Sequence, residues 1–406
     1  MEEHKGFCIK TILNKPFPVE IETKQDFNFG DALESVYPLL DIIFGYLSDE
    51  DLENVAKIKM SWKEVADRAL KKRSKLCWFT CFQKHKSNFL KHSGNLHHNN
   101  ASIGIILFDY RRLKLNKYIC LHKDTDNLEK MTFADYLCKE IVNSKVNYCL
   151  LSCPKVVSFF GCDMYYPNGS MFDGILLPQI PGIKTTMFYC NPLKLKKTPS
   201  MIETYIKSND EIMCLLLFSL TDLHRSMDNL FKILLQDSKQ EDIAVGGGII
   251  RGSKSFQNVQ KFSKKVINTN DIFCIAFSRE KNTNPKFSAA SFVINGNDFS
   301  NQEFFEEVLK FKKRVIIRKN SVGFRICCGA KWEKDEESII FSKHFPNTPL
   351  LGLEADGEIG WDCFNLPDDE ESPESKPKKS KLNCPKNHEW STVFVIITWG
   401  DIVKET

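Results

Sequence analysis

The chain has 406 residues, of which 42% are hydrophobic and 27% are charged, and its formal net charge at pH 7 is +4. This length predicts two or three folded domains, and the mild positive charge argues against a dedicated nucleic-acid-binding protein, which usually carries clustered basic residues. No run approaches the roughly 18 apolar residues that cross a bilayer. A secretory signal is not expected, because Glu2 and Glu3 stand where such a signal is basic, and 15 cysteines then favour reduced thiols in the cytoplasm or nucleus.

The segment 31–75 carries a clear helical pattern. Between Val36 and Leu47, apolar residues recur at the spacing of one helix face. Pro38 lies at the start of this pattern, where a helix tolerates proline because the missing N–H would be unpaired in any case. A helix over residues 36–47 is therefore predicted.

Two capping patterns follow this helix. Ser48 with Asp51 has the spacing of a capping box and predicts the start of a second helix. Ser61 with Glu64 repeats the spacing and predicts the start of a third. Three helices of this size bury too little apolar surface to be stable alone, so the module is expected to pack against something else.

Two stretches of this module resemble the F-box family. They are residues 36–52, VYPLLDIIFGYLSDEDL, and residues 58–62, IKMSW. Tyr37 replaces a leucine of the family pattern, and Lys59 places a charge where a small residue is common. The resemblance implies that the module binds a Skp-type adaptor, through Pro38, Leu39, Leu40, Ile43, Phe44, Leu47, Leu52 and Trp62. The alternative is an ordinary helical cap, because short motif matches carry false-positive risk.

The segment 76–100 is expected to connect this module to the rest of the chain, as a helix or extended connector followed by a polar linker. Cys77, Cys81 and His85 would share one helix face, but a structural zinc site needs a second matched pair of ligands, which the sequence lacks. Packed thiols and a polar loop are therefore predicted, with no metal site. The lack of paired Cys and His also argues against a RING inside the chain, so any ligase chemistry would come from partners.

From residue 101 onward, short apolar runs alternate with helical patterns, which predicts α/β layers. The predicted strands are 103–108, 148–153, 174–177, 213–218, 244–245, 273–278, 287–294, 322–328, 350–353 and 391–398. The predicted helices are 132–142, 203–207, 227–235, 301–313 and 336–345.

These patterns divide into two blocks of ordinary domain size, residues 101–250 and 251–406. Residues 1–30 have little periodicity and are expected to form a flexible tail. Residues 366–388 are rich in charged residues, serine and proline, which predicts a disordered surface loop. The expected fold class is mixed: an all-α N-terminal module followed by two α/β (α+β) blocks on mixed sheets.

Four motifs in these blocks resemble FIST domains, in the order seen in that family. They are FDGILLPQIPGIK at 172–184, AVGGG at 244–248, VGFRICCG at 322–329 and PLLGLEADGEIG at 349–360. An F-box followed by two FIST blocks resembles the F-box-only protein twenty-two family. The chain departs from that family at 328–331, where the family tends to have Gly-Arg-Gly.

This combined resemblance implies a non-catalytic substrate receptor of an SCF-type ubiquitin ligase. The adaptor would join it to a cullin scaffold and a RING subunit. The FIST blocks would bind proteins for ubiquitination and proteasomal degradation, with nuclear chromatin or transcription regulators among the expected clients. No cofactor, direct nucleic-acid contact or membrane contact is expected.

Two glycine-bearing motifs are candidates for substrate or ligand binding. Three consecutive glycines can form an anion-binding nest or a tight turn with positive φ. The lack of a lysine after these glycines argues against nucleotide hydrolysis. Glu358 is expected in a turn, either bound to an amine or Arg of a partner or simply solvated. The candidate residues are Gly246, Gly247, Gly248, Cys328, Gly357 and Glu358. A small-ligand-sensing module built around this pocket is the alternative function.

Cys327 and Cys328 end a predicted strand, so one of the two must face outward. Arg325 is a candidate for lowering the pKa of a nearby thiol. A cysteine nucleophile would also need a positioned histidine, and His344 is the nearby candidate in the sequence. A redox-sensitive or ligandable Cys328 is the more favoured hypothesis.

Residues 376–381, KPKKSK, form a short basic run within the acidic, serine-rich loop. Such a run is typical of a nuclear localisation signal, and an ordinary solvated loop is the alternative.

Overall fold

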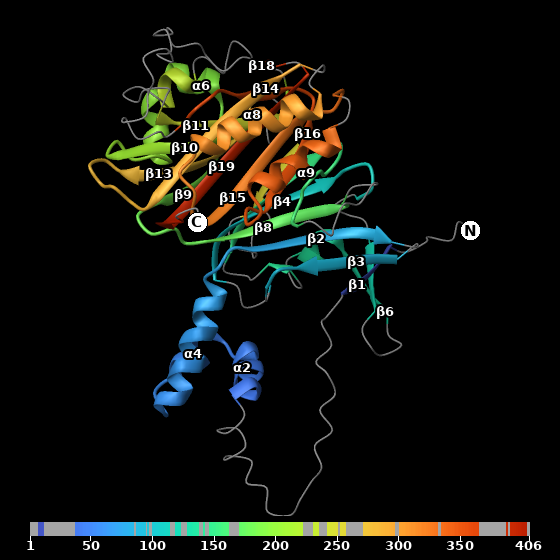
Figure 1. Cartoon of the computed structure of the whole chain (residues 1–406), viewed down its shortest axis with the longest axis vertical. Helices are drawn as coiled ribbons and strands as arrows, with labels where there is room; N and C mark the ends of the chain where they lie inside the picture. The colour runs from blue at the N-terminus through green and yellow to red at the C-terminus, as the bar shows by residue number, and fades with distance from the viewer. Residues whose placement is uncertain are drawn as a thin grey trace, which may run out of the picture. The chain divides into compact units, whose positions relative to one another are not determined.

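The computed structural model describes residues 7–11, 37–84, 87–94, 96, 100–113, 118–122, 128–137, 141–142, 146–161, 170–221, 230–234, 242–250, 252–256, 271–296, 300–331, 334–364, 387–388 and 390–403 (Figure 1). The chain divides into two compact units. Unit 1 comprises Met1–Gly104, Leu115–Val146 and Ile175–Gln179, and unit 2 comprises Ile105–Lys114, Asn147–Gly174 and Ile180–Thr406. The run 376–381 and most of the expected loop at 366–388 lie outside the described residues.

Unit 1 contains the predicted three-helix module. Its helices are α2 (Tyr37–Tyr46), α3 (Asp49–Val55) and α4 (Met60–Arg73). The Ser48–Asp51 capping box is confirmed, with reciprocal bonds at the start of α3. The predicted box at Ser61 is wrong, because Lys59 is extended and α4 begins directly after it without a side-chain cap.

Unit 1 also contains a set of strands in the order β2-β3-β1-β5-β6. They are β2 (Cys77–Lys84), β3 (Ser87–His92), β1 (Phe7–Thr11), β5 (Tyr118–His122) and β6 (Leu128–Thr132), and α5 (Phe133–Tyr136) follows β6. The prediction of a flexible tail over residues 1–30 is wrong for residues 7–11, because they form β1, which pairs in parallel with β3 and β5.

The expected helix or connector at 76–90 is instead an antiparallel hairpin of β2 and β3. Cys77 and Cys81 are both buried. A spacing of four residues places two side chains on one face of a helix and also on one face of a strand. The spacing of Cys77 and Cys81 therefore did not distinguish a helix from a strand. His85 lies outside the described residues.

Unit 2 is built on two mixed sheets, which confirms the α+β class. The first has the order β18-β17-β11-β10-β13-β9 and the second the order β14-β19-β15-β16. The first consists of β18 (Asn387–His388), β17 (Glu358–Gly360), β11 (Ala244–Ile249), β10 (Asp210–Ser219), β13 (Ile272–Glu280) and β9 (Lys184–Cys190). The second consists of β14 (Phe287–Asn295), β19 (Ser391–Ile402), β15 (Arg318–Cys328) and β16 (Leu350–Ala355).

The first of these sheets combines strands from both predicted blocks, since β10 precedes residue 250 and its neighbour β13 follows it. The bounds 101–250 and 251–406 as separate domains therefore stay predictions. The other strands are β4 (Ala101–Asp109), β7 (Asn147–Cys153), β8 (Phe172–Pro178) and β12 (Gly252–Phe256). Further helices include α6 (Pro192–Lys197), η2 (Pro199–Thr204), α8 (Asn301–Lys313) and α9 (Lys334–His344).

The ten predicted strands are confirmed, although most run longer than predicted, and α8 has the predicted bounds. Within the predicted helix at 132–142, the described residues form α5 and, at 137 and 141, π-helical turns. No helix that the structure describes combines the length and apolar character needed to cross a membrane.

Each face of the four-stranded sheet packs against a different layer. On one face, α8 and α9 bury Phe304, Phe311 and Phe341 against Phe394 of β19 (Figure 1). On the other face, Val393 of β19 approaches the six-stranded sheet so closely that a Cβ on Gly360 would lie 2.6 Å from a Val393 methyl carbon. Residues 246, 248 and 360 are glycines because larger side chains would not fit between the two sheets.

Candidate functional site

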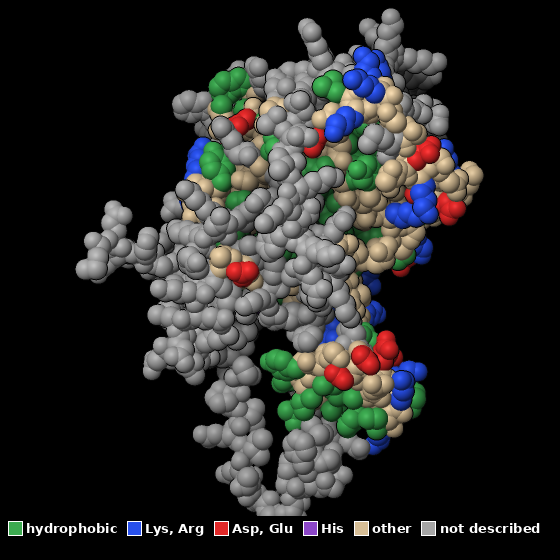
Figure 2. All heavy atoms as spheres, turned by 180° about the vertical axis from the view of Figure 1, so that it is seen from behind, with side chains coloured by type: hydrophobic (Ala, Val, Ile, Leu, Met, Phe, Trp, Pro, Cys, Tyr) green, Lys and Arg blue, Asp and Glu red, His purple; other side chains and the backbone are tan. Residues whose placement is uncertain are grey.

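Apolar side chains of the helical module are exposed on its surface. The exposed fractions are 51% for Ile42, 76% for Tyr46, 66% for Ile58 and 71% for Met60. Figure 2 shows hydrophobic side chains gathered on one side of the module, with acidic side chains beside them. A small helical module that leaves so much apolar surface in water is suited to bind a partner.

The predicted adaptor-binding residues divide between this surface and the module's own core. Leu40, Phe44 and Leu52 are buried, and they pack with Val65, Ala66 and Ala69. Leu39, Ile43, Leu47 and Trp62 are partly exposed, and the side chain of Pro38 lies outside the described residues. The sequence pattern marked the apolar face of α2, but it did not single out Ile42 and Tyr46, which point away from that face.

Arg73 holds α2 in place from the end of α4. Its Nη2 donates hydrogen bonds to the carbonyl oxygens of Phe44 at 3.1 Å, Gly45 at 3.3 Å and Leu47 at 2.6 Å. Helix α2 has no basic residue in its last turn, so Arg73 supplies the positive charge that a helix C-terminus favours. The position of the exposed face of α2 therefore depends on a residue that is distant in sequence.

The three glycines of the second candidate site lie in a buried strand. Gly246, Gly247 and Gly248 belong to β11, between β10 and β17. The tight-turn and anion-nest hypotheses are therefore wrong, because these backbone groups belong to sheet ladders. Gly248 pairs with Glu358 of β17, and a Cβ on Gly248 would lie 2.8 Å from the Gly357 carbonyl oxygen.

Glu358 is fully buried, so both turn hypotheses for this carboxylate are wrong in this conformation. Its Oε2 accepts a 2.9 Å hydrogen bond from Ser391 Oγ, and Oε1 has no hydrogen-bond partner among the described residues. Burial raises the pKa of Glu358 to about 7, although hydrogen bonds from Ser391 and from the Cys328 side chain oppose this shift. The structure thus brings together Gly248, Cys328, Gly357 and Glu358. Of these four residues, Cys328 is partly exposed and the other three are buried.

We expect Glu358→Gln to remove a pH dependence of folding. A carboxyl whose folded pKa lies above its ordinary value stabilises the folded state below that ordinary value, here 4.5, and this stability is lost as the pH rises through about 7. The wild-type free energy of unfolding should therefore contain a component of ~3 kcal/mol that falls across this window. Urea unfolding at several pH values would measure this component. If the free energy of unfolding of the variant fell with pH as steeply as that of the wild type, the assignment of the component to Glu358 would be contradicted.

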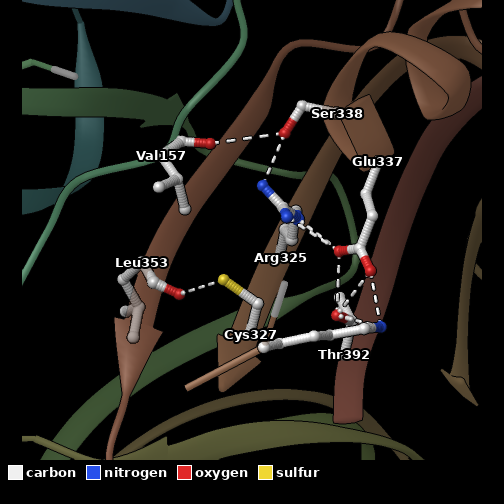
Figure 3. Close-up of polar contacts among 8 residues, drawn as sticks. Val157, Arg325, Cys327, Glu337, Ser338, Leu353 and Thr392 are labelled. Atoms are coloured by element: carbon white, nitrogen blue, oxygen red, sulfur yellow. Dashed lines mark hydrogen bonds and ion pairs between the residues drawn. The ribbon is translucent and has the colours of Figure 1, made fainter. Parts of the chain in front are cut away.

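A buried charge network lies at the base of α9, on the helix-covered face of the sheet (Figure 3). Glu337 Oε2 accepts hydrogen bonds from Arg325 Nε at 3.1 Å and Arg325 Nη2 at 2.7 Å. Lys331 Nζ lies 2.5 Å from Glu337 Oε1, and Thr392 Oγ1 donates to Glu337 Oε2 at 2.8 Å. Arg325 Nη1 donates to Ser338 Oγ at 2.8 Å. All five side chains are buried.

The sequence prediction gave Arg325 another role, the activation of a neighbouring thiol. Its guanidinium instead bonds Glu337 and Ser338. A single arginine inside the otherwise apolar run 322–328 was the signal for a buried partner, since buried charges are paired. Periodicity did not identify that partner.

The two adjacent cysteines face opposite sides, as predicted. Cys327 is buried and its thiol lies 3.6 Å from the Leu353 carbonyl oxygen, whereas Cys328 is partly exposed. His344 lies at the end of α9 with its ring 4.3 Å from the Phe305 ring, and burial lowers its pKa. These contacts give the cysteine–histidine nucleophile hypothesis no support.

Comparison with known proteins supports a distant relationship with one F-box protein. No family model matches the chain. Human F-box only protein 22 is 24% identical over 198 residues, which cover 46% of this chain and 47% of that protein, and the Pongo abelii protein of the same name gives the same values. The matched part of the chain spans about half the length of these relatives. A cyanuric acid hydrolase from A. caulinodans aligns with 74% of the chain at 6% identity and a TM-score of 0.30, which is too low to support an argument.

Proposed function

We propose that this protein is a non-catalytic substrate receptor of an SCF-type ubiquitin ligase. The observation that carries the proposal is the helical module. It fills its own small core with six buried residues and still exposes four large apolar side chains. The distant similarity to F-box only protein 22 supports the same proposed function.

In this proposal, the module binds a Skp-type adaptor, which links the chain to a cullin scaffold and a RING subunit. The α/β part holds a client protein, so the receptor raises the effective concentration of client lysines near the ubiquitin carrier. Ubiquitination then directs the client to the proteasome. The clients would be cytoplasmic or nuclear, including chromatin or transcription regulators, and nuclear entry would depend on residues 376–381.

Replacing Ile42 and Met60 together by glutamate is expected to weaken adaptor binding at least tenfold. Two carboxylates would then have to lose water at an apolar interface, which is costly. Because both side chains are exposed, the melting temperature should change little. Titration of the purified chain with a Skp-type adaptor by calorimetry measures the affinity.

The matched control is Leu193→Glu, which alters a 50%-exposed apolar residue on α6 outside the module. It should bind the adaptor as wild type does. Leu40 and Phe44 are poor test positions, because polar residues there would disrupt the core of the module. A wild-type chain that fails to bind the adaptor at micromolar concentration would refute the proposal.

The small-ligand sensor stays an alternative with one supporting observation, the convergence of Cys328 and Glu358. Glu358 is fully buried in this conformation, so a ligand would require the strands around it to move. Stabilisation by a metabolite that Glu358→Gln abolishes would support the sensor function.

A further inference from the structure

Helix α2 carries part of the exposed apolar surface, but its own sequence stabilises its last turn poorly. Ile42 and Tyr46 lie about one helical turn apart and are 51% and 76% exposed. Gly45 falls in the last turn, where glycine weakens a helix, and this turn has no basic residue. With 10 residues, α2 is also shorter than the roughly 12–15 residues at which an isolated helix becomes marginally stable. The position of Ile42 and Tyr46 therefore depends on contacts from outside α2.

Two arginines of α4 reach α2, and they differ in burial. Arg68 Nη2 lies 3.3 Å from Asp41 Oδ1, and these side chains are 47% and 35% exposed, so water competes with the ion pair. Arg73 is buried, and its Nη2 donates to three carbonyl groups within residues 44–47. Water cannot easily replace hydrogen bonds made by a buried side chain. Arg73 therefore fixes the last turn of α2 more firmly than Arg68 does.

The main chain of Arg73 is itself held in place. Its carbonyl oxygen accepts a 3.0 Å hydrogen bond from the N–H of Asn100, the residue directly before β4. The next residue, Ser74, donates its N–H to the Leu70 carbonyl oxygen at 3.1 Å. The guanidinium therefore extends from a backbone with little freedom to move. Within unit 1, Arg73 thus links the end of α2, the end of α4 and the chain at residue 100.

We propose that Arg73 is a positioning residue for adaptor binding, which holds the last turn of α2 in the binding conformation without touching the adaptor. This inference rests on the proposed function, because the adaptor is the partner whose binding Arg73 governs. A protein that is ordered for binding in only a fraction of its molecules has an affinity reduced by that fraction. Loss of the Arg73 bonds lowers this fraction for the turn that carries Tyr46. The association rate then falls, whereas the dissociation rate stays the same, because the bound adaptor itself holds the turn.

The first test measures the association and dissociation rates of a purified Skp-type adaptor on the immobilised full chain by biolayer interferometry. Arg73→Met should lower the affinity about tenfold through the association rate. Arg73→Lys should lower it less, because an ammonium keeps the charge but not the planar set of donors. The matched control, Arg68→Met, should change the affinity less than about twofold. Ile42→Glu combined with Met60→Glu, which alters the contact surface, should instead act mainly on the dissociation rate.

The second test is hydrogen exchange of the free full chain, followed by mass spectrometry. In Arg73→Met, the backbone amides of residues 42–47 should exchange at least about fivefold faster than in the wild type, whereas those of residues 64–70 in α4 should keep their protection. This distribution distinguishes a loosened turn from an unfolded module, in which both segments would exchange faster. If Arg73→Met does not fold, Arg73→Lys serves for both measurements.

Wild-type association rates in both Arg73 variants, or an affinity lost through faster dissociation, would overturn the proposal. Faster exchange at residues 42–47 with an unchanged association rate would also overturn it, because Arg73 would then be a structural residue only. Faster exchange in both segments would lead to the same conclusion. The receptor function fails on a different result, a wild-type chain that does not bind the adaptor. The failure of this inference is therefore distinguishable from the failure of the proposed function.

Discussion

Gly247→Ala is expected to lower the free energy of unfolding by more than about 3 kcal/mol, or to prevent folding. A Cβ at this position would overlap the backbone carbonyl of Leu217, its register partner on β10. Both strands are central in the six-stranded sheet, so neither can move away without breaking a ladder. Overlap with backbone is more damaging than overlap with a side chain, because no rotamer change relieves it.

Urea unfolding of three alanine variants would check this expectation. Gly246→Ala should have a smaller effect than Gly247→Ala, because its Cβ meets a methyl group of Val395 that has some freedom to shift. Gly252→Ala is the matched control on strand β12, where the nearest atom would lie at an ordinary 3.7 Å, Cβ of Ser152. Near-equal stability of all three variants would show that the sheets are not packed as closely as the glycines indicate.

Glu337→Ala is expected to cost about 3–5 kcal/mol, since it leaves buried Arg325 and Lys331 without their shared carboxylate. Both positive side chains are less than a tenth exposed, so water cannot replace the lost partner. The matched control is Glu336→Ala, which removes an exposed carboxylate from the preceding position of α9 and should cost much less. Chemical unfolding at neutral pH measures both.

The same carboxylate predicts an acid-sensitive component of stability. Burial by itself would raise the pKa of Glu337, but the charges of Arg325 and Lys331 outweigh burial and leave the pKa below its ordinary value of 4.5. A lowered folded pKa gives stability that is present above pH 4.5 and is lost as the pH falls through the folded pKa. This dependence has the opposite sign to that of Glu358, and a Glu337→Gln variant that keeps the wild-type acid response would contradict it.

Replacing the whole network provides a further check on this account. Arg325→Met, Lys331→Met and Glu337→Leu together remove every charge and should recover much of the loss seen in Glu337→Ala, because well-packed apolar groups can substitute for a buried ion pair. A triple variant as unstable as the single one would show that packing around Glu337, rather than charge, determines the stability there.

Local sequence signals identified most of the elements because their causes are local. The capping box at Ser48 depends on residues three positions apart, and α8 begins with another capping box, between Ser300 and Glu303. Buried strands such as β15 and β19 show as apolar runs because both of their faces are covered. The hairpin of β2 and β3 was missed because spacing in steps of four residues fits both a helix and a strand.

The candidate sites depended on distant residues, and the sequence predicted them only in part. The three consecutive glycines suggested a turn or an anion nest, but they lie in a strand that other strands approach closely. Gly246 and Gly248 face the four-stranded sheet, and Gly247 faces the backbone of its neighbour β10. Glu358 is a polar residue in a glycine-rich motif, and such a pattern favours a turn. Its burial follows from pairing with β11 and β18, which lie far away along the chain.

By itself, the amino-acid sequence determined the helical module and the mixed α/β class, because these follow from periodicity and short local patterns. Only the tertiary structure decided which apolar residues of the module stay exposed, which partner Arg325 finds and which carboxylate is buried. Those outcomes depend on which strands and helices meet in space, and pairing between distant segments leaves little trace in the local order of residues.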